Sequence, residues 1–510
     1  MRALISTWDK SGLDEFARGL VELGWRLVAS GDTAAAIEAI GLPVEHVEAV
    51  TDSPEMLGGR VKTLHPRIHA GILARRDDQE DAATLAQHGI EPLDLVCVNF
   101  YPFAKTVSRP DVDDAEALEM IDIGGPALLR GAAKNFAHVA AVSSPAQYGP
   151  VLDELGHDGE LSLDTRRRLA AEAFAHTAAY EAGISRWFNV PATFPDTIVL
   201  PLEKELDLAY GENPHQRGAY YVEHAVRSHL LSMVEQLHGK PLTFNNLNDL
   251  DTARALVREF ALPACVIVKH ASPCGVAVGA NAEEAYDKAL ACDPTSAYGG
   301  VVVFNRQVEE LLGAKLAEQF VEVLFSPGYD DAALAALRQK QNTRILLDSE
   351  RRRADPEARH YKRVRGGMLV QDPDPELEER ENWRVVSGSV DEHHWDDLVF
   401  AWRVCKHVTS NAIVLAKGLA TIGIGAGQMS RVDSVRIAVE KAAEFGHDAA
   451  GASLASDAFF PFPDGPQIAL DAGTTAIVQP GGSRRDEEVI AAVQQAGAAM
   501  VFTGRRHFRH

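Results

Sequence analysis

The segment MRALISTWDKSGLDEFARGLVELGWRLVASGDT, residues 1–33, has the pattern of strand, helix, strand and turn. RALIS (2–6) and WRLVA (25–29) are short apolar runs typical of buried strands. Between them, Ser11 stands where an N-cap is expected and Gly24 where a helix stops. A strand that returns through a helix to a second strand favours a parallel α/β sheet. We therefore expect an α/β fold.

The same alternation continues along the chain. Apolar strand candidates recur at LDLVCVNF (93–100), HVAAV (138–142), VIVK (266–269), GVVVF (300–304), IGIGAG (422–427), TAIVQP (475–480) and AAMVF (498–502). The proline-rich NVPATFPDTIVLP (189–201) predicts a linker, and 510 residues are too many for one ordinary core. We therefore expect two to four domains, with a linker at 189–201. The charge-dense RRRADPEARHYKRVR (351–365) is typical of a solvated connection.

Composition limits the classes of partner and compartment. A net charge of -23 argues against a nucleic-acid or anionic-membrane surface, although a small site can still be locally positive. No apolar run approaches the roughly 20 residues of a membrane span, and the start of the chain lacks the pattern of a signal peptide. The five scattered cysteines predict reduced thiols in a cytoplasm rather than a disulfide framework.

VIVKHASPCGVAVG (266–279) places Lys269, His270 and Cys274 at or just after the end of a buried strand. A zinc nucleobase deaminase needs His-x-Glu and Pro-Cys-x-x-Cys, and this segment completes neither pattern. Nothing in the sequence puts a base or a helix N-terminus beside Cys274 to make it a nucleophile. Because ligands bind at the carboxyl ends of strands in α/β sheets, Lys269 and His270 are candidates for an acid–base pair. On spacing alone, a capped strand end with an incidental histidine fits equally well.

Three further segments are typical of anion or ring binding. GRVKTLHPRIHAGIL (59–73) is basic within an acidic protein, which indicates either an anion site or a solvated basic loop. ASGDT (29–33) opens a helix, where backbone N–H groups and the helix dipole favour phosphate. The aromatic run in SDAFFPFPDG (456–465) fits either core packing or the wall of a site for a flat heteroaromatic ring.

Distinctive motifs follow one another in order from end to end. They are STWDKSGL, GRVKTLHPRIHAGILAR, NFYPF, IDIGGPALLRGAAKN, YGENPHQ, VKHASPCG, SNAI, GAGQMSR, SDAFFPF, QPGGS, DEE and FTGRRHFRH. With them the whole chain resembles the bifunctional purine-biosynthesis family in which a phosphoribosylaminoimidazolecarboxamide formyltransferase is fused to an IMP cyclohydrolase. The resemblance implies a methylglyoxal-synthase-like parallel-sheet domain in 1–195. It implies a formyltransferase of two cytidine-deaminase-like subdomains in 196–510.

The resemblance also implies a chemistry. A formyl group would pass from 10-formyltetrahydrofolate to the 5-amino group of 5-aminoimidazole-4-carboxamide ribonucleotide, and the product would close with loss of water to IMP. The ligands would be small nucleotides and a folate, with no zinc, and the resemblance leaves a monovalent cation site open. It further implies a cytoplasmic homodimer with the formyltransferase sites at the subunit interface.

Site residues follow from the same resemblance. For formyl transfer it implies His270 as the base, Lys269 as proton donor or electrostatic partner, and Asn411 as a polar aid. The substrate or folate contacts of that site are Tyr210, Gly299, Gly300, Arg431, Phe459, Asp464 and Arg506. For ring closure the catalytic group is Lys62, Tyr101, Asp122 and Lys134. The substrate contacts of the ring-closure site are Ser6, Lys10, Ser30, Gly31, Thr33, Arg60, Thr63, Gly124 and Gly125.

Three positions depart from the family pattern. Trp8 stands where Ser is frequent and Asp32 where Gly is usual. Ala209 stands where an Arg that contacts phosphate is usual, and Lys204 or Arg217 could supply the missing charge. Two alternatives follow: a formyltransferase with an impaired cyclohydrolase domain, or an N-terminal domain that only regulates. A zinc deaminase is a third.

Overall fold

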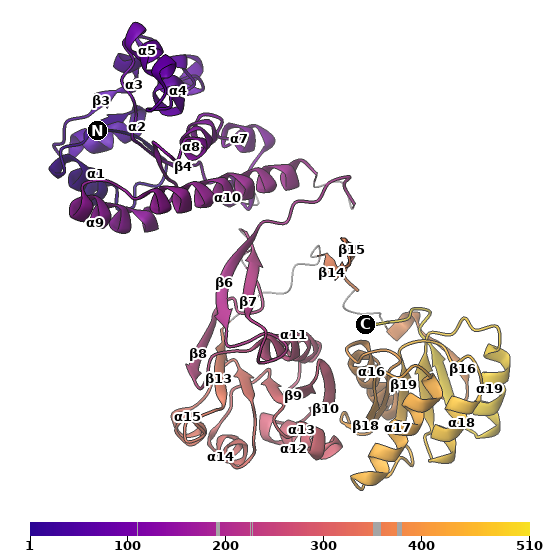
Figure 1. Ribbon diagram of the computed structural model, residues 1–510. Coiled ribbons are helices and arrows are strands. Elements are labelled where there is room, and N and C mark those ends of the chain that lie inside the picture. The colour runs from indigo at the N-terminus through magenta and orange to yellow at the C-terminus, as the bar shows by residue number, and fades with distance from the viewer. Residues whose placement is uncertain (110, 190–193, 225, 227, 350–358, 375–379) are drawn as a thin grey trace. The chain divides into compact units, whose positions relative to one another are not determined.

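The computed structural model describes residues 1–109, 111–189, 194–224, 226, 228–349, 359–374 and 380–510. Within it the chain forms two compact units (Figure 1). The first comprises Met1–Glu203 with Val222–Val226, and the second comprises Lys204–Tyr221 with Arg227–His510. Of the expected linker, residues 190–193 lie outside the described residues, and 194–201 contain neither helix nor strand.

The first unit contains a five-stranded sheet in the order β3-β2-β1-β4-β5. All of its pairings are parallel, which confirms the predicted parallel α/β sheet. After β1 the chain adds β2 and β3 on one side of that strand, and then β4 and β5 on the other side. The carboxyl ends of β1 and β4 therefore flank a crevice of the kind that binds ligands. The strands are β1 (Arg2–Thr7), β2 (Arg26–Ala29), β3 (Glu45–His46), β4 (Leu95–Asn99) and β5 (Ala140–Val142).

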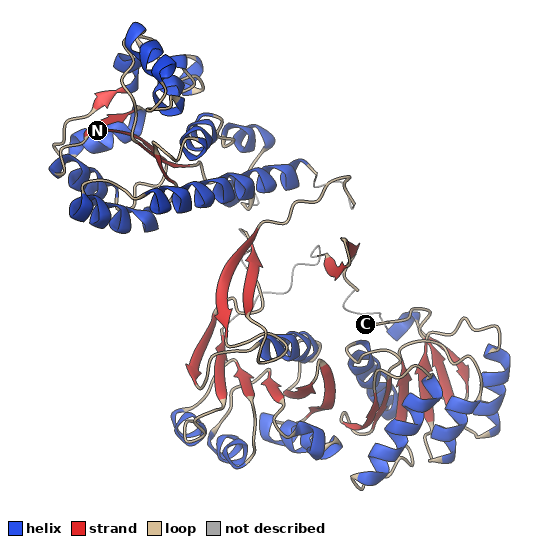
Figure 2. Cartoon of the chain, viewed as in Figure 1, coloured by secondary structure: helices blue, strands red, loops and turns tan. Residues whose placement is uncertain are grey.

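Helices cover both faces of this sheet (Figure 2). Successive side chains of a strand point to opposite faces of the sheet, and both faces are apolar here. Ile5 packs with α1, α2 and α9 on one face, whereas its neighbour Leu4 packs with α4, α8 and α10 on the other. Helix α1 begins one residue later than expected: Gly12 is its N-cap, and Ser11 donates its hydroxyl to Asp9 at 2.6 Å. The helices are α1 (Leu13–Glu22), α2 (Gly31–Ala39), α3 (Val47–Thr51), η1 (Leu57–Gly59), α4 (Pro66–Leu73), α5 (Gln79–Gln87), α6 (Phe103–Val107), α7 (Asp114–Glu119), α8 (Gly124–Lys134), η2 (Pro145–Gln147), α9 (Tyr148–Asp158) and α10 (Leu163–Phe188).

The second unit contains two six-stranded mixed sheets with the same topology. One has the order β10-β9-β11-β12-β13-β8 and the other the order β18-β17-β19-β20-β21-β16. In each, two antiparallel pairings are followed by two parallel ones and a last antiparallel one. The strands are β8 (Val234–His238), β9 (Ala264–Lys269), β10 (Ser272–Val278), β11 (Val301–Phe304), β12 (Val323–Ser326), β13 (Arg344–Asp348), β16 (Arg384–Ser387), β17 (Ile413–Ala416), β18 (Thr421–Gly425), β19 (Ser453–Ser456), β20 (Ala476–Gln479) and β21 (Ala499–Phe502).

One apolar core joins these two sheets. Buried residues of α11 and α16, such as Leu250 and Leu398, pack in a single cluster with strands from both sheets. The remaining helices cover the outer faces, where Leu312 and Val435 lie in separate clusters. The helices are α11 (Phe244–Val257), α12 (Ala282–Cys292), α13 (Pro294–Ala297), α14 (Glu310–Glu318), α15 (Asp331–Leu337), η3 (Arg380–Asn382), α16 (Glu392–Lys406), α17 (Arg431–Glu444), α18 (Asp464–Asp471) and α19 (Asp486–Gln495).

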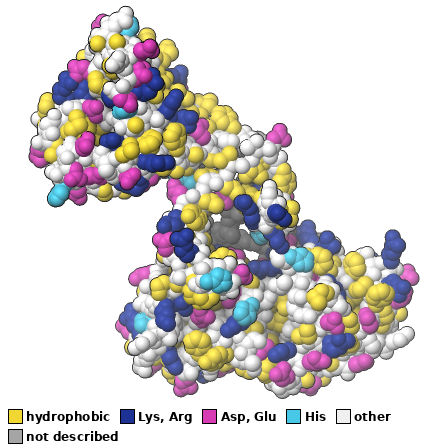
Figure 3. Space-filling model, viewed as in Figure 1, with side chains coloured by type: hydrophobic (Ala, Val, Ile, Leu, Met, Phe, Trp, Pro, Cys, Tyr) yellow, Lys and Arg dark blue, Asp and Glu magenta, His cyan; other side chains and the backbone are white. Residues whose placement is uncertain are grey.

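Two further sheets have two strands each and share no strand with the large ones. They are the pair β6 (Leu202–Leu208) and β7 (Gly218–Glu223), and the pair β14 (His360–Val364) and β15 (Gly367–Gln371). Residues 351–358 of the expected solvated connection lie outside the described residues, and 360–364 form strand β14, whose residues are mostly exposed. Charged side chains of both signs are mixed over the visible surface (Figure 3). Among the described residues, no helix is long and apolar enough to cross a bilayer.

Candidate active sites

The first candidate site lies at the carboxyl ends of β1, β2 and β4. Thr7 at the end of β1 is in register with Asn99 at the end of β4, and Gly31 begins α2 directly after β2. Gly31 has a φ of 49°, and a Cβ there would lie 2.6 Å from Nζ of Lys62. The absence of a side chain at Gly31 therefore lets the Lys62 ammonium approach the start of α2.

A hydroxyl and an ammonium group fix the β1 side of this site. Thr33 donates its hydroxyl to the carbonyl of Thr7 at 3.1 Å, and Nζ of Lys10 lies 3.3 Å from the same hydroxyl. Lys10 also donates to the carbonyl of Thr7. Burial lowers the pKa of Lys10, and the carboxylates of Asp32 and Asp9 partly oppose that shift. The departure at Asp32 thus places a carboxylate near Lys10.

Lys62 pairs with a carboxylate that the sequence did not indicate, and its ammonium acts electrostatically on Tyr101. Nζ of Lys62 pairs with Glu55 at 2.8 Å, and both side chains are partly exposed. They line a small pocket together with His65. Burial raises the pKa of Tyr101, as does the charge of Asp122, whereas the Lys62 ammonium lowers it. The ring of Trp8 lies edge-on to Tyr101 at a centroid distance of 5.2 Å, so Trp8 contributes an apolar contact where a hydroxyl was expected.

Asp122 and the start of α8 form the other side of the site. Oδ1 of Asp122 accepts the backbone N–H of Gly125 at 2.8 Å. A Cβ on Gly125 would lie 2.5 Å from Oδ2 of Asp122, and one on Gly124 would lie 2.9 Å from the hydroxyl of Thr63. Burial raises the pKa of Asp122, and the N–H groups of Gly125 and Gly124 partly oppose the shift. The two glycines therefore let the carboxyl and Thr63 close over the helix start.

Some residues predicted for the first site lie away from the group formed by Lys10, Lys62, Tyr101 and Asp122. Lys134 is exposed at the last residue of α8, an 11-residue helix, which places it about 15 Å along the axis from Gly124. Arg60 pairs with Glu119, and both side chains are largely exposed. Ser6 is half-buried within β1, and Ser30 is the buried N-cap residue of α2.

The second candidate site begins at a turn that the sequence did not reveal. Strand β9 ends at Lys269, as expected, and it pairs antiparallel with β10 and with β11. Lys269 is in register with Ser272, so His270 and Ala271 alone form the turn. Their φ values are 52° and 59°, as in a two-residue hairpin of the I′ type. The tight turn leaves His270 exposed and Lys269 half-buried.

Backbone carbonyls and one carboxylate hold this turn. Nζ of Lys269 donates to the carbonyls of Tyr298 at 2.7 Å and Gly299 at 3.0 Å. Gly299 has a φ of 70°, and a Cβ there would lie 3.1 Å from Nζ of Lys269. Oδ1 of Asp249 accepts the N–H of Ala271 at 2.6 Å. Burial raises the pKa of Asp249, and the N–H of Ala271 and the charge of His270 oppose that shift. Neither Asp249 nor the carbonyl contacts had a local signal in the sequence.

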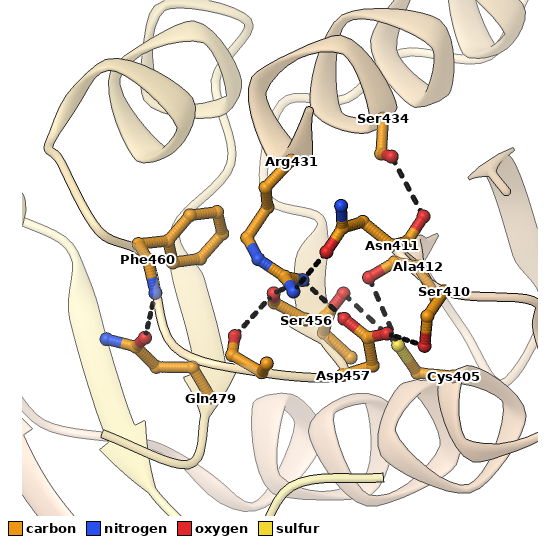
Figure 4. A network of polar contacts seen from close by, with 12 residues as sticks. Cys405, Ser410, Asn411, Ala412, Arg431, Ser434, Ser456, Asp457, Phe460 and Gln479 are labelled. Atoms are coloured by element: carbon orange, nitrogen blue, oxygen red, sulfur yellow. Dashed lines mark hydrogen bonds and ion pairs between the residues drawn. The ribbon is translucent and has the colours of Figure 1, made fainter. Parts of the chain in front are cut away.

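Asn411 lies in a buried polar network (Figure 4). Its Nδ2 donates to the carbonyls of Gln428 at 2.8 Å and Met429 at 3.2 Å. Arg431 donates to Oδ1 of Asn411 at 2.7 Å and pairs with the fully buried Asp457. The Arg431 guanidinium, expected as a ligand contact, is thus buried in an internal ion pair and orients Asn411.

A direct contact joins the hairpin turn to the Asn411 segment. The hydroxyls of Ser272 and Thr409 lie 2.9 Å apart, and each is two residues from a proposed catalytic side chain. Arg509 forms a second link. Its Nη2 donates to the hydroxyl of Thr252 at 2.7 Å, and its carbonyl accepts the N–H of Ser410 at 2.9 Å. The fold therefore brings His270 and Asn411, which are 141 positions apart in the sequence, to one place.

The other residues expected at this site are more dispersed. Phe459 is 37% exposed, whereas its neighbour Phe460 is buried, so the aromatic run contributes to both core and surface. Asp464 opens α18, and the Arg506 guanidinium lies over the ring of Phe508 at 4.6 Å. The carbonyl of Tyr210 accepts the N–H of Phe244, and Gly300 directly precedes β11. Near Ala209, Lys204 is paired with Asp207 at 3.0 Å.

Cys274 does not have the surroundings of a reactive thiol. It lies on β10, and burial raises the pKa of its thiol well above the ordinary value. A thiol that stays protonated at neutral pH is a poor nucleophile. Among the described residues, no three side chains of the His, Cys, Asp and Glu types are grouped to hold a metal ion.

The family models and a full-length relative point to the same family. The sequence matches the family model described as AICARFT/IMPCHase bienzyme over residues 132–441 and the MGS-like domain over residues 12–127. It is 49% identical over 514 aligned positions to the bifunctional purine biosynthesis protein PurH of Anoxybacillus flavithermus, covering 100% of this chain and 99% of that protein. The crystal structure of ForH is 39% identical with a TM-score of 0.35, covering 38% of this chain and 98% of that one.

Proposed function

Because the chain belongs to the AICARFT/IMPCHase bienzyme family, we propose that its two units hold separate active sites for two consecutive reactions. The chain is a bifunctional enzyme of purine biosynthesis that catalyses the last two steps to IMP. The first adds a formyl group to 5-aminoimidazole-4-carboxamide ribonucleotide, and the second closes the formylated product with loss of water. A folate carries the formyl group, and we propose 10-formyltetrahydrofolate as that donor.

One observation carries the division of labour. The proposed catalytic residues Lys62, Tyr101 and Asp122 all lie in the first unit, and Lys269, His270 and Asn411 all lie in the second. We therefore assign ring closure to the domain of residues 1–195 and formyl transfer to 196–510.

For formyl transfer, His270 is the base. The substrate's 5-amino nitrogen is a weak nucleophile because its lone pair is delocalised, so its proton has to leave as the new C–N bond forms. The exposed imidazole of His270 can take that proton and return it to N10 of the folate as the old C–N bond breaks. The ammonium of Lys269, anchored by two carbonyls, stabilises negative charge on the formyl oxygen. Oδ1 of Asn411 keeps one lone pair beyond its bond to Arg431 and can accept from the amine.

For ring closure, the carboxamide nitrogen attacks the formyl carbon of the same molecule. Holding the two groups in contact supplies much of the rate enhancement. The charges of Asp122 and Lys62 both act on Tyr101, which suits these groups to move protons as the hydroxyl leaves as water. Gly31, Lys10 and the start of α2 are the proposed phosphate site. We also propose a contribution from Lys134, the last residue of α8.

We further propose a cytoplasmic homodimer whose formyltransferase sites lie at the subunit interface. Exposed apolar side chains beside the second site support this. Met429 is 96% exposed next to the Asn411 network, and Tyr298, whose carbonyl anchors Lys269, is 65% exposed. Burying such side chains against a second copy would be favourable. We propose no role for zinc.

Two variants test the division of labour. Wild-type enzyme incubated with aminoimidazolecarboxamide ribonucleotide and 10-formyltetrahydrofolate should yield IMP, separated from the intermediate by chromatography. His270→Ala should abolish formyl transfer and still close pre-formylated substrate. Lys62→Ala should accumulate the formylated intermediate at an unchanged rate of formyl transfer. Equal loss of both activities in either variant would contradict two independent sites. Closure no faster than the spontaneous reaction in the wild type would favour the alternative of an impaired or regulatory first domain.

A further inference from the structure

The hydroxyl of Tyr180 contacts the segment that carries Asp122. Tyr180 lies on α10, and its Oη accepts the backbone N–H of Asp122 at 2.8 Å while donating to the carbonyl of Met120 at 2.9 Å. Both bonds cross about 60 positions of sequence and tie α10 to the loop before α8. The one hydroxyl of Tyr180 therefore bonds both Asp122, which is proposed to transfer protons, and Met120.

The same face of α10 supports the strand end that carries Tyr101. The ring of Phe100 lies 4.9 Å from the ring of Tyr180 and 4.6 Å from that of His176, one turn earlier on the helix. Phe100 also closely approaches Gly125, whose Cβ would lie 3.1 Å from its ring. Tyr180 thus packs beneath both segments of the ring-closure site, by ring contact on one side and by hydrogen bonds on the other.

We propose that Tyr180 is a positioning residue for ring closure, whose hydroxyl holds the Met120–Asp122 segment so that the Asp122 carboxyl stays beside Tyr101 and Gly125. This inference rests on the proposed role of Asp122. Tyr180 itself does not touch the reacting atoms. Its action is to fix the main chain of Asp122, since the carboxyl's own anchor, the N–H of Gly125, lies only three residues further along the chain, at the start of α8.

The chain supplies a matched control for the loss of a buried phenolic hydroxyl. Tyr148 lies in the same unit, is 5% exposed, and stacks on Phe16 at 4.3 Å. Its hydroxyl accepts from the thiol of Cys97 at 3.5 Å, on the opposite face of the sheet from Phe100. Tyr148→Phe therefore removes a buried hydroxyl from this unit at a place away from the Asp122 segment. Formyl transfer, measured on the same preparations, reports on the integrity of the second unit.

In full-length enzyme given the pre-formylated substrate, Tyr180→Phe should lower kcat for ring closure about tenfold, because an N–H and a carbonyl lose their partner. The KM should change by less than about twofold, since the proposed phosphate contacts are untouched. Formyl transfer in Tyr180→Phe, and both activities in Tyr148→Phe, should match the wild type. Unchanged kcat, or an equal loss of kcat in Tyr148→Phe, would overturn the proposal.

A double-mutant cycle asks whether Tyr180 acts through Asp122. With enzyme in excess over substrate, the double variant should close the ring less than about twofold more slowly than Asp122→Asn alone. The carboxylate that Tyr180 positions is already gone in Asp122→Asn, so losing the Tyr180 hydroxyl adds little. A further tenfold loss would overturn the positioning role. If Asp122→Asn closes the ring at the wild-type rate, the assignment of Asp122 fails instead. That result is distinct from a failure of Tyr180 alone.

Discussion

Gly31 shows how a single missing side chain defines a site. Its φ of 49° and the 2.6 Å from its Cβ position to Nζ of Lys62 mean that a methyl group would both strain the turn and displace the ammonium. Gly31→Ala should therefore cost about 1 kcal/mol of stability and lower ring closure at least about tenfold. Measuring both activities and the urea midpoint checks this.

The control for Gly31 isolates backbone strain. Gly24 has a φ of 80° and open space around its Cβ position. Gly24→Ala should lower stability similarly and leave ring closure unchanged. If both variants lose ring closure equally, strain alone explains the effect and the contact with Lys62 is irrelevant.

Lys269 carries the second residue-level prediction. Lys269→Met removes an ammonium held by two carbonyls, so formyl transfer should fall at least about 100-fold because the developing oxyanion loses its charge. Ring closure of pre-formylated substrate should be unaffected. Lys288→Met is the control, since Lys288 forms only a partly exposed pair with Glu284 on α12. Loss of formyl transfer in the control as well would point to a general effect of charge.

Residues of the sites could be proposed from the sequence, but their partners could not. Lys269 and His270 stand out because charged groups end an apolar strand. Asp249, Glu55 and Arg509 gave no local signal, because each acquires its role only when distant segments meet. Arg431 was expected to contact a ligand, yet its charge is paired with Asp457, which no spacing rule connects to it.

At the scale of elements, the β9–β10 hairpin was missed for a definable reason. Two-residue hairpins of this type are usually recognised by Asn-Gly or Gly-Gly, which adopt positive φ at little cost. Here His270 and Ala271 occupy both positions with φ of 52° and 59°. The parallel sheet of the first unit was predicted correctly because its strands are separated by helices of ordinary pattern.

The C-terminal tail is an element with a testable role. Its Arg509 bonds the hydroxyl of Thr252 on α11, and its backbone pairs with Ser410 beside Asn411. Arg509→Met should lower formyl transfer about tenfold, since a charged hydrogen bond contributes roughly 1.5–3 kcal/mol, and should leave ring closure intact. Deletion of His510 alone is the control and should have little effect. Full formyl transfer in Arg509→Met would show that the tail does not organise the site.

At the scale of the whole molecule, the second unit repeats one sheet topology twice. The repetition is not visible as a sequence period, because the buried strands need only apolar residues of suitable size, as in VIVK and IVLA. The proposed active site arises where the two halves meet, at the contact of Ser272 with Thr409. The site residues of this unit therefore come from both halves, with Lys269 and His270 in the first and Asn411 in the second.

Two histidines, His176 partly buried and His407 buried, predict the acid stability of the fold. Burial lowers the pKa of His176 and of His407 below 6.5. The unfolded chain then binds protons before the folded chain does, so stability falls as pH drops below about 6.5. His176→Gln should make the urea midpoint less dependent on pH between 5 and 7, whereas replacement of the exposed His88 should not. An unchanged dependence in His176→Gln would assign the acid sensitivity to other groups.

The proposed dimer makes the two activities respond differently to dilution. If a second copy covers Met429 beside the Asn411 network, separated subunits should lose formyl transfer while ring closure per chain stays constant. Met429→Glu should promote that separation, because a charge replaces an apolar contact that stabilises by roughly 1.5–3 kcal/mol when buried. Leu311→Glu, at another exposed apolar residue, on α14 and 71% exposed, is the control. Sedimentation measured alongside both assays decides the question: monomers of Met429→Glu that transfer formyl groups at the wild-type rate would place the whole site within one chain.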